Sequence, residues 1–303
     1  MIPCSKVSSQ LSLLAAEAVV PEQLPCYVQA VGLSEACPCS VGEPFVFYLA
    51  GERAVLVAYP GFEREKEFLN PERYSSLLAK ALAEIPQETR FLTLLSPLPT
   101  ETLPLPSGLR ATPESPFRSE ADDWYWTVPL PCTPPSDKVR NMLRRAAQEV
   151  DTAPEPWGPE AASLAAFYCR TRHLTEGSRF IYGRMEEYLS SCSEALLLGA
   201  RRRSDGSLAA CAVGDFTALG TAFYMFAFRR PDAPPGCADA LLAALMEEGV
   251  RRGHGCMNLG LGIRPGIEFF KKKWRAQRGL PYYERTWRIS PIRRGILSRL
   301  FGG

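Results

Sequence analysis

Histidine is nearly absent from this chain of 303 residues: only His173 and His254 occur, which excludes a histidine-rich metal site. Ten cysteines are present, but no two form a CxxC pair, and Cys37-Pro38-Cys39 is too tight for the usual zinc spacing. Several cysteines lie in apolar runs, as Cys211 does in "LAACAV". We therefore expect no metal, and buried reduced thiols rather than disulfides.

Long apolar segments are also lacking. No run reaches the roughly 18 residues that a membrane-spanning helix requires. The N-terminus has no basic region before "LSLLAAEAVV", and Glu17 interrupts that run, so we expect no signal peptide. Together with the thiols, these absences favour a cytoplasmic protein.

Positive charge is concentrated at one end of the chain. The formal net charge is +2, yet between Arg264 and Arg299 there are eleven Lys/Arg and two acidic residues, a local charge of +9, so the rest carries −7. Such an end can hold a phosphate-bearing ligand, a nucleic acid or an acidic membrane surface, or it can be a solvated basic face. The tail "SPIRRGILSRLFGG" could lie on an anionic membrane surface or dock on the protein body.

A proline-rich segment divides the chain, which is long enough for about two domains. Four prolines lie between Pro129 and Pro135, so we expect domains at 1–132 and 133–303. In the first, "FVFYLAGERAVLVAY" predicts two strands, "PERYSSLLAKALAEI" a helix, and "RFLTLLSP" and "DDWYWTVPL" two more strands. Residues 97–116 read as a loop. The first half is therefore predicted to be α/β.

The second half has a more regular pattern. Ser136 is placed to cap a helix that runs to about Val150, and "PEAASLAAFYCRTRH" and "RMEEYLSSC" predict two further helices. Three strands follow, the first two joined by a turn at Ser204-Asp205-Gly206. A helix from residue 237, a strand at 256–261, a helix at 264–274 and a strand at 281–289 complete the order.

This order of elements resembles the GNAT acyltransferase fold, a mixed and mostly antiparallel sheet flanked by helices. Within residues 136–289, three segments are characteristic: "KVRNMLRRA", "ADALLAALMEEGVRRGHGCMNLGLG" and "EFFKKKWRA". On these segments the second half resembles the Fem family of peptidoglycan bridge-forming aminoacyltransferases and its FemAB-like acetyltransferase relatives. Fem-like proteins commonly consist of two GNAT-like halves, the first degenerate, so the resemblance implies a duplicated fold in a bacterial protein.

The resemblance implies transfer of an acyl or aminoacyl group to an amine. The donor would be acetyl-CoA, another acyl-CoA or an aminoacyl-tRNA, and the acceptor a small-molecule or peptidoglycan-precursor-like amine. A lysine of the "FKKKW" cluster would lie near the reacting carbonyl, which indicates Lys271 or Lys273; two residues apart on a helix, they cannot both face one cleft. Tyr224 is a third catalytic candidate, as a general base or proton donor, beside Glu176 and Tyr182.

Small residues indicate where the donor would bind. In the resembling fold, Asn258, Gly260 and Gly262 fall where two strands splay beside the acyl-binding cleft. The usual acyl-CoA loop has a basic residue three positions before its glycine; here the segment reads Ala-Pro-Pro-Gly-Cys-Ala, so Gly236 and Ala238 match and the basic position does not. A structural need for glycine is the alternative at each position.

Basic residues at the end of the second helix, Arg170, Arg172 and His173, are candidates to bind a phosphate-bearing acceptor. The alternative is a helix C-terminus stabilised by positive charge. His254, in "RRGHG", is expected to be an exposed turn residue rather than a base. Because the donor loop is degenerate and no base is evident, a non-catalytic module that binds a phosphorylated ligand or partner is the rival prediction.

Overall fold

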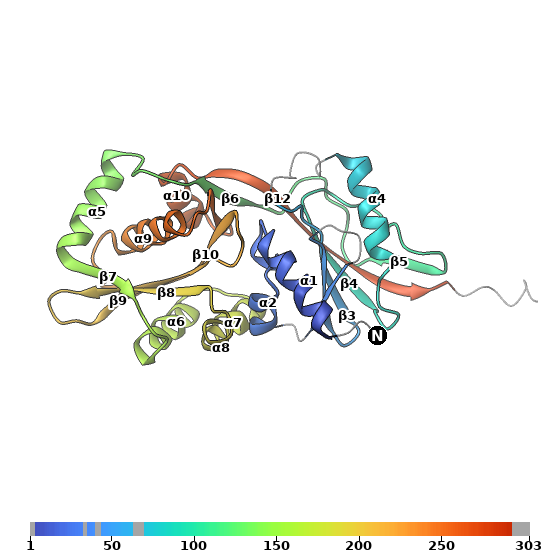
Figure 1. The fold of residues 1–303 in the computed structure, drawn as a ribbon, viewed down its shortest axis with the longest axis horizontal. Helices are drawn as coiled ribbons and strands as arrows, with labels where there is room; N and C mark the ends of the chain where they lie inside the picture. Colours follow the sequence, from blue (N-terminus) through green and yellow to red (C-terminus); the bar gives the residue numbers. More distant parts are fainter. Residues whose placement is uncertain (1–3, 33–34, 40–43, 63–69, 293–303) are drawn as a thin grey trace, which may run out of the picture.

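A computed structural model describes residues 4–32, 35–39, 44–62 and 70–292 (Figure 1). Its strands form one twelve-stranded sheet in the order β1-β2-β3-β4-β12-β6-β11-β10-β9-β8-β7, and β5 pairs with β12. Among the described strands, β3–β4 and β10–β11 pair in parallel and the other pairs are antiparallel. The predicted α/β class with a mixed, mostly antiparallel sheet is confirmed.

The first half starts with helices and continues with a small sheet. Its elements are α1 (Cys4–Ala16), the 3₁₀ turn η1 (Pro21–Gln23), α2 (Pro25–Val31), β1 (Glu35–Pro38), β2 (Val46–Ala50), β3 (Arg53–Val57), α4 (Pro71–Leu82), β4 (Phe91–Ser96), β5 (Leu109–Pro113) and β6 (Asp123–Pro129). The side chain of Asn70 accepts hydrogen bonds from the Glu72 and Arg73 amides and so fixes the start of α4. The buried face of α4 packs on the sheet of this half.

The second half places helices on both faces of its sheet (Figure 1). Its elements are α5 (Asp137–Glu149), β7 (Val150–Pro154), α6 (Pro159–Thr171), α7 (Glu176–Tyr182), α8 (Met185–Ser191), β8 (Ala195–Arg202), β9 (Leu208–Asp215), β10 (Thr221–Arg229), α9 (Cys237–Arg251), β11 (Cys256–Leu261), α10 (Pro265–Lys273) and β12 (Gln277–Pro291). Ser136 caps α5 as predicted, accepting from the Val139 amide at 3.3 Å. The apolar face of α9 lies in the core, against β8 and β9.

Some elements are absent from the sequence prediction. The expected loop at 97–116 contains β5, and β1, α2, β7 and α7 were not predicted. β5 is an edge strand that pairs with the end of β12 and leaves most of its side chains exposed or half-buried. It therefore lacks the apolar alternation by which strands are predicted.

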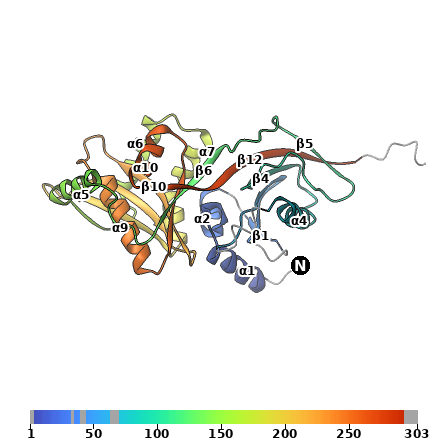
Figure 2. The same ribbon diagram turned by 90° about the horizontal axis from the view of Figure 1, so that it is seen from above.

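Two strands cross the predicted boundary at residue 132. β6, from the first half of the chain, pairs with β11 of the second half. β12 pairs with β6 up to Tyr282, then with β4 and β5 of the first half, and Figure 2 shows it running from one half to the other. The division into 1–132 and 133–303 stays a prediction, and backbone pairing in both directions joins its two parts.

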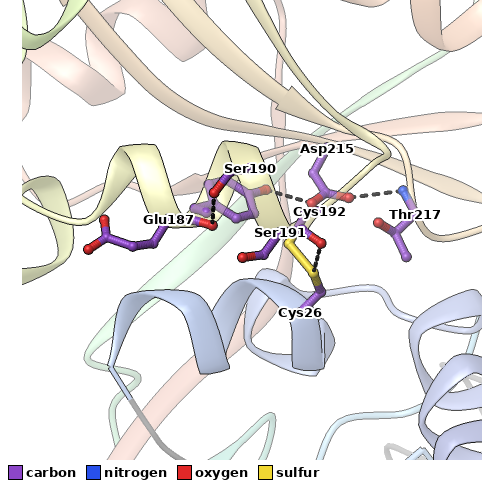
Figure 3. The surroundings of a disulfide bond; sticks show 8 residues. Cys26, Glu187, Ser190, Ser191, Cys192, Asp215 and Thr217 are labelled. Carbon is purple, nitrogen blue, oxygen red and sulfur yellow. Dashed lines mark hydrogen bonds between the residues drawn. A yellow bond between two sulfur atoms is a disulfide. The ribbon is translucent and has the colours of Figure 1, made fainter.

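A disulfide also joins the two halves. Cys26 in α2 is bonded to Cys192 at the end of α8, 166 residues away, next to the buried carboxylate of Asp215 (Figure 3). The expectation of reduced thiols is wrong for this pair. Cys26 and Cys192 come together only through the tertiary contact between α2 and α8, which the sequence does not reveal. Cys39, Cys211 and Cys237 are buried free thiols.

Candidate active site

Strands β10 and β11 pair over a short stretch and then part. Their parallel register covers Thr221–Cys256, Ala222–Met257 and Phe223–Asn258, whereas β10 continues to Arg229. Each strand has an irregularity just beyond this stretch, between Tyr224 and Phe226 in β10 and between Asn258 and Leu261 in β11. The splayed strand pair that the resemblance implies is therefore present.

A cavity of about 810 Å³ opens at this divergence. Its apolar wall is aromatic: Tyr168, Tyr182, Phe226 and Phe228 make edge-to-face contacts at 5.4–5.7 Å between α6, α7 and β10. Among the described residues that line it, none is aspartate or glutamate, and five are cations: Arg172, Arg229, Arg230, Arg264 and Lys271. We call this cavity the cleft. Its charge favours an anionic or carbonyl-bearing ligand.

Lys271 is the buried cation of the cleft. Its side chain comes from α10, is 3% exposed, and donates hydrogen bonds of 2.6 Å to the carbonyl oxygens of Gly260 and Leu261. Burial lowers the pKa of its ammonium to about 7, against the raising effect of Asp123 and Glu268. Near neutral pH the protonated amine has a third N–H, beyond the two used by the carbonyls, to offer to a ligand in the cleft.

The two carbonyls that hold Lys271 lie at the irregular end of β11. Gly260 has φ +75°, in the left-handed region that favours glycine, and a Cβ there would lie 4.0 Å from Lys271 Nζ. Asn258, 1% exposed, accepts from the Gly260 amide at 2.7 Å and donates to Val19 O at 2.8 Å. Gly260 lines the cleft, whereas Asn258 fixes the strand end from behind it.

The loop between β11 and α10 is held by Asp123 of β6. Its carboxylate accepts from the Gly262 amide at 3.0 Å and the Ile263 amide at 2.8 Å. Ile263 has φ +52°, a rare conformation for a β-branched residue, and its side chain is 67% exposed at the mouth of the cleft. Gly262 itself does not line the cavity; a Cβ there would lie 2.8 Å from Asp123. The loop thus stores backbone strain beside the cleft.

The other two lysines of the cluster have different surroundings. Lys273 donates to both carboxylate oxygens of Asp239, which is 3% exposed and also accepts from Trp274 Nε1 at 2.8 Å. Lys272 is exposed and pairs with Glu268 at 2.7 Å. The two lysines therefore point to different places. Lys271 lines the cleft, and Lys273 attaches α10 to the start of α9.

Tyr224 lies in the cleft opposite α10. Its ring stacks on Phe270 with 6.5 Å between centroids. Burial, aided by the charge of Asp239, raises the pKa of its hydroxyl. The phenol therefore stays protonated near neutral pH and is suited to donate a proton rather than to accept one.

The start of α9 has a structural need for its glycine. Gly236 has φ +90°, and a Cβ there would lie 2.3 Å from the Met142 carbonyl of α5. Ala238, two residues later, lines the cleft. Helix α5 thus packs directly on the loop that holds phosphates in the resembling fold. Of the two candidate residues, only Ala238 reaches the cavity.

The predicted acceptor residues divide in the same way. Arg172 lines the cleft and lies over the Tyr168 ring at 5.7 Å, whereas Arg170 and His173 are exposed and outside it. Sequence reasoning missed Arg229, Arg230 and Arg264. Arg229 ends β10 and Arg230 follows it, and this basic pair shortly before the Ala-Pro-Pro-Gly loop was the available signal. Arg264 donates to the His173 carbonyl at 2.9 Å and so closes the same side as Arg172.

Other sequence candidates lie elsewhere. His254 is 6% exposed, with its two ring nitrogens 3.1 and 2.8 Å from the Gly249 and Ala218 carbonyls, so the expectation of an exposed residue is wrong. Glu176 is exposed at the start of α7. In the described part of the chain, no group of three or more His, Cys, Asp or Glu could hold a metal, and no helix could cross a membrane. The tail beyond Ile292 lies outside the described residues.

Comparison with solved structures identifies the fold. The chain is similar to FemX, with a TM-score of 0.56 at 9% identity over 94% of this chain and 96% of that one. It is similar to the C-terminal domain (DUF2156) of an Agrobacterium fabrum protein assigned as a lysylphosphatidylglycerol synthetase, with a TM-score of 0.53 at 14% identity over 98% and 95%. A third likeness is to L-PGS from Bacillus licheniformis, with a TM-score of 0.51 at 15% identity over 98% and 94%.

These likenesses cover nearly the whole length of each chain, and they confirm the GNAT/Fem-like fold that the sequence predicts. No family model matches the sequence. No curated protein matches it either. At identities of 9–15%, the likeness establishes the arrangement of the elements and leaves the activity to be argued from the cleft.

Proposed function

We propose that the protein transfers an acyl or aminoacyl group from a CoA- or tRNA-linked donor to an amine, in the cleft between β10 and β11. The observation that carries the proposal is the position of Lys271, buried beside the splayed strands with two of its N–H groups fixed by backbone carbonyls. Attack of an amine on the donor carbonyl creates a tetrahedral oxyanion. The third N–H of protonated Lys271 would stabilise it.

Two further steps have candidate residues in the same cavity. The attacking amine loses a proton, and the thiolate or alkoxide that leaves the carbonyl takes one up. The protonated Tyr224 hydroxyl, in the cleft, is the candidate donor to the leaving group, and its phenolate would regain the proton that the amine releases. The aromatic wall formed by Tyr168, Tyr182 and Phe226 would exclude water from the acyl group. Exclusion of water strengthens each electrostatic contact within the cavity.

The donor's phosphates would bind at the end of β10. Arg229 has no ion-pair partner among the described residues, and Arg230 pairs with the exposed Asp232 at 3.0 Å. Both arginines line the cleft a few residues before Gly236 and Ala238. They would supply the charge that the Ala-Pro-Pro-Gly loop lacks, aided by the amide groups of the first turn of α9.

Calorimetric titration and an acyl-transfer assay test this proposal. Acetyl-CoA, a longer acyl-CoA and aminoacyl-tRNA would be titrated separately into the full chain, and one of them should bind saturably. Lys271→Met should keep donor binding within a few-fold and lower the transfer rate roughly 100-fold or more. Lys272→Met is the matched control and should change neither. Equal rates for Lys271→Met and wild type would overturn the assignment.

A non-catalytic module that binds a phosphorylated ligand is the second candidate. It is favoured by one observation: no described carboxylate lines the cleft to accept the proton of an attacking amine. In that case a phosphorylated ligand would bind, Arg229→Ala and Arg230→Ala would each weaken it roughly tenfold, and no donor would be consumed. Binding of acyl-CoA without turnover of any amine in a screened set would favour this function.

A further inference from the structure

The hydrogen bonds of Lys271 fix the orientation of its amine. Nζ donates bonds of 2.6 Å to the carbonyl oxygens of Gly260 and Leu261, and among the described residues no carboxylate forms an ion pair with it. Besides its bond to Cε, a lysine nitrogen has three tetrahedral positions. The two carbonyls occupy two of them, so the third is left for a ligand in the cleft, which Lys271 lines.

This third position has two chemical states. In the protonated amine it is an N–H, which can stabilise an oxyanion. In the neutral amine it is a lone pair, while the two remaining N–H groups keep the Gly260 and Leu261 carbonyls as acceptors. The lone pair of a desolvated lysine is a nucleophile. A carbonyl carbon held beside Lys271 can therefore be attacked from the position that otherwise stabilises its oxygen.

Burial makes the neutral state accessible. The Lys271 side chain is 3% exposed, and burial lowers the pKa of its ammonium to about 7, although the charges of Asp123 and Glu268 oppose the loss of the proton. Near neutral pH a large fraction of the chains therefore carries a free amine in the cleft.

The other two lysines of α10 lack this arrangement. Lys272 is exposed and pairs with Glu268 at 2.7 Å, and Lys273 pairs with Asp239 at 2.6 Å. An ion pair favours the protonated amine, which has no lone pair to offer. Within the cluster, Lys271 is the lysine suited to form a covalent bond.

We infer that Lys271 is a self-acylation site, modified on Nζ by a small activated ester or thioester that enters the cleft. The inference rests on the proposed function, in that the natural source of the acyl group would be the donor itself. Nζ attacks the carbonyl carbon, a C–N bond forms, and the C–S or C–O bond to the leaving group breaks. Nζ loses one proton and the leaving thiolate or alkoxide gains one, so no further reactant is consumed.

Acylation of Lys271 would stop transfer in the cleft. The amide nitrogen has no charge and a single N–H, so it cannot stabilise an oxyanion and leaves one of the Gly260 and Leu261 carbonyls without its donor. The cavity of about 810 Å³ has room for the attached acyl group. A donor that is bound without an amine acceptor would thus inactivate the site, whereas an acceptor would protect it by consuming the acyl group.

The test incubates the full chain with p-nitrophenyl acetate, a small activated ester that is not one of the proposed donors. Peptide mass spectrometry with fragmentation follows the acetylation of each lysine over time. At about pH 7.5 we expect Lys271 to be acetylated roughly tenfold faster than Lys272 or more, because an ordinary lysine amine is almost wholly protonated at this pH.

Release of p-nitrophenolate measures the same reaction in solution and provides matched variants. Wild type and Lys272→Arg should both release about one equivalent per chain in a fast phase, because both retain the buried amine. Lys271→Arg should lack this phase, since a guanidinium keeps its proton and is no nucleophile at this pH.

The pH dependence of the Lys271 rate needs no variant. The rate should rise with pH and level off above about pH 8, whereas an amine of ordinary pKa would give a rate that still rises at about pH 9. The described lining of the cleft has no histidine, and its arginines stay protonated over this range. Tyr168 adds a phenol to the lining, and burial raises the pKa of the three other titrating side chains, those of Tyr182, Cys211 and Tyr224.

Acetylation of Lys271 no faster than that of Lys272, or a Lys271 rate that still rises at about pH 9, would overturn the self-acylation site. Failure of every acyl donor to bind would instead overturn the proposed function. The two results are distinguishable because p-nitrophenyl acetate contains neither CoA nor tRNA, and its reaction with Lys271 needs no amine acceptor.

Discussion

Replacing Lys271 by methionine should change how the free energy of unfolding depends on pH. The ammonium is 3% exposed and its pKa is lowered from 10.5 to about 7 by burial. Between these two values the unfolded chain binds a proton that the folded chain does not, so wild type becomes more stable as the pH rises through this window. Methionine has similar length and no titratable group, so it removes this dependence.

The magnitude follows from the width of the window. Each unit of pKa difference corresponds to about 1.4 kcal/mol. Burying this amine therefore costs at most about 5 kcal/mol at the low-pH end of the window, and the cost vanishes above pH 10.5. Between about pH 7.5 and pH 9, the stability of wild type minus that of Lys271→Met should rise by roughly 2 kcal/mol. The hydrogen bonds to the Gly260 and Leu261 carbonyls favour the charged amine and act against this cost.

Urea unfolding followed by circular dichroism at several pH values measures this difference. Lys272→Met, which removes an exposed lysine from the same helix, should give a curve parallel to wild type. If the difference between wild type and Lys271→Met were constant within about 0.5 kcal/mol over the window, the amine would titrate near its ordinary value, and its assignment as the buried cation of the cleft would be refuted.

Three other substitutions test the frame around the cleft. Asp239→Asn should lower the stability by roughly 3 kcal/mol in urea unfolding, because it leaves the half-buried Lys273 ammonium without its counter-charge. Gly236→Ala should cost about 2–3 kcal/mol by the same measure, since alanine disfavours φ +90° and its Cβ would overlap the Met142 carbonyl. Cys26→Ser should cost roughly 2–4 kcal/mol under non-reducing conditions, and dithiothreitol should lower the melting temperature of wild type and not that of the variant.

The regular elements of the fold could be predicted because their signals are local. The stripe of α4, the cap of α5 and the turn at Ser204-Asp205-Gly206 each depend on residues a few positions apart, and each is present. β5 and β7 could not be predicted, because edge strands with exposed side chains carry no apolar alternation. The disulfide was missed for a related reason: nothing within α2 or α8 indicates that the two helices meet.

The candidate site was predictable in part. The glycine-ended strand and the lysine cluster located the cleft, and helix geometry required that Lys271 and Lys273 point to different places. Which of them lines the cleft depends on Asp239, which lies 32 residues before Lys271. The carboxylate of Asp239 pairs with Lys273 and leaves Lys271 to line the cleft. Arg229 and Arg264 were missed because each is an ordinary charged residue at the end of an element until the cleft brings them together.

A strand from the first half supplies residues that hold the cleft in place. Asp123, which holds the loop before α10, and Tyr125, which contacts Glu22, both belong to β6, a strand from the first half inserted between β11 and β12. A second half cut off at residue 133 would lack that strand, and β11, which carries the carbonyls that hold Lys271, would become a sheet edge. The first half therefore contributes directly to the geometry of the cleft, even though the lysine, the splayed strands and the arginines all belong to the second.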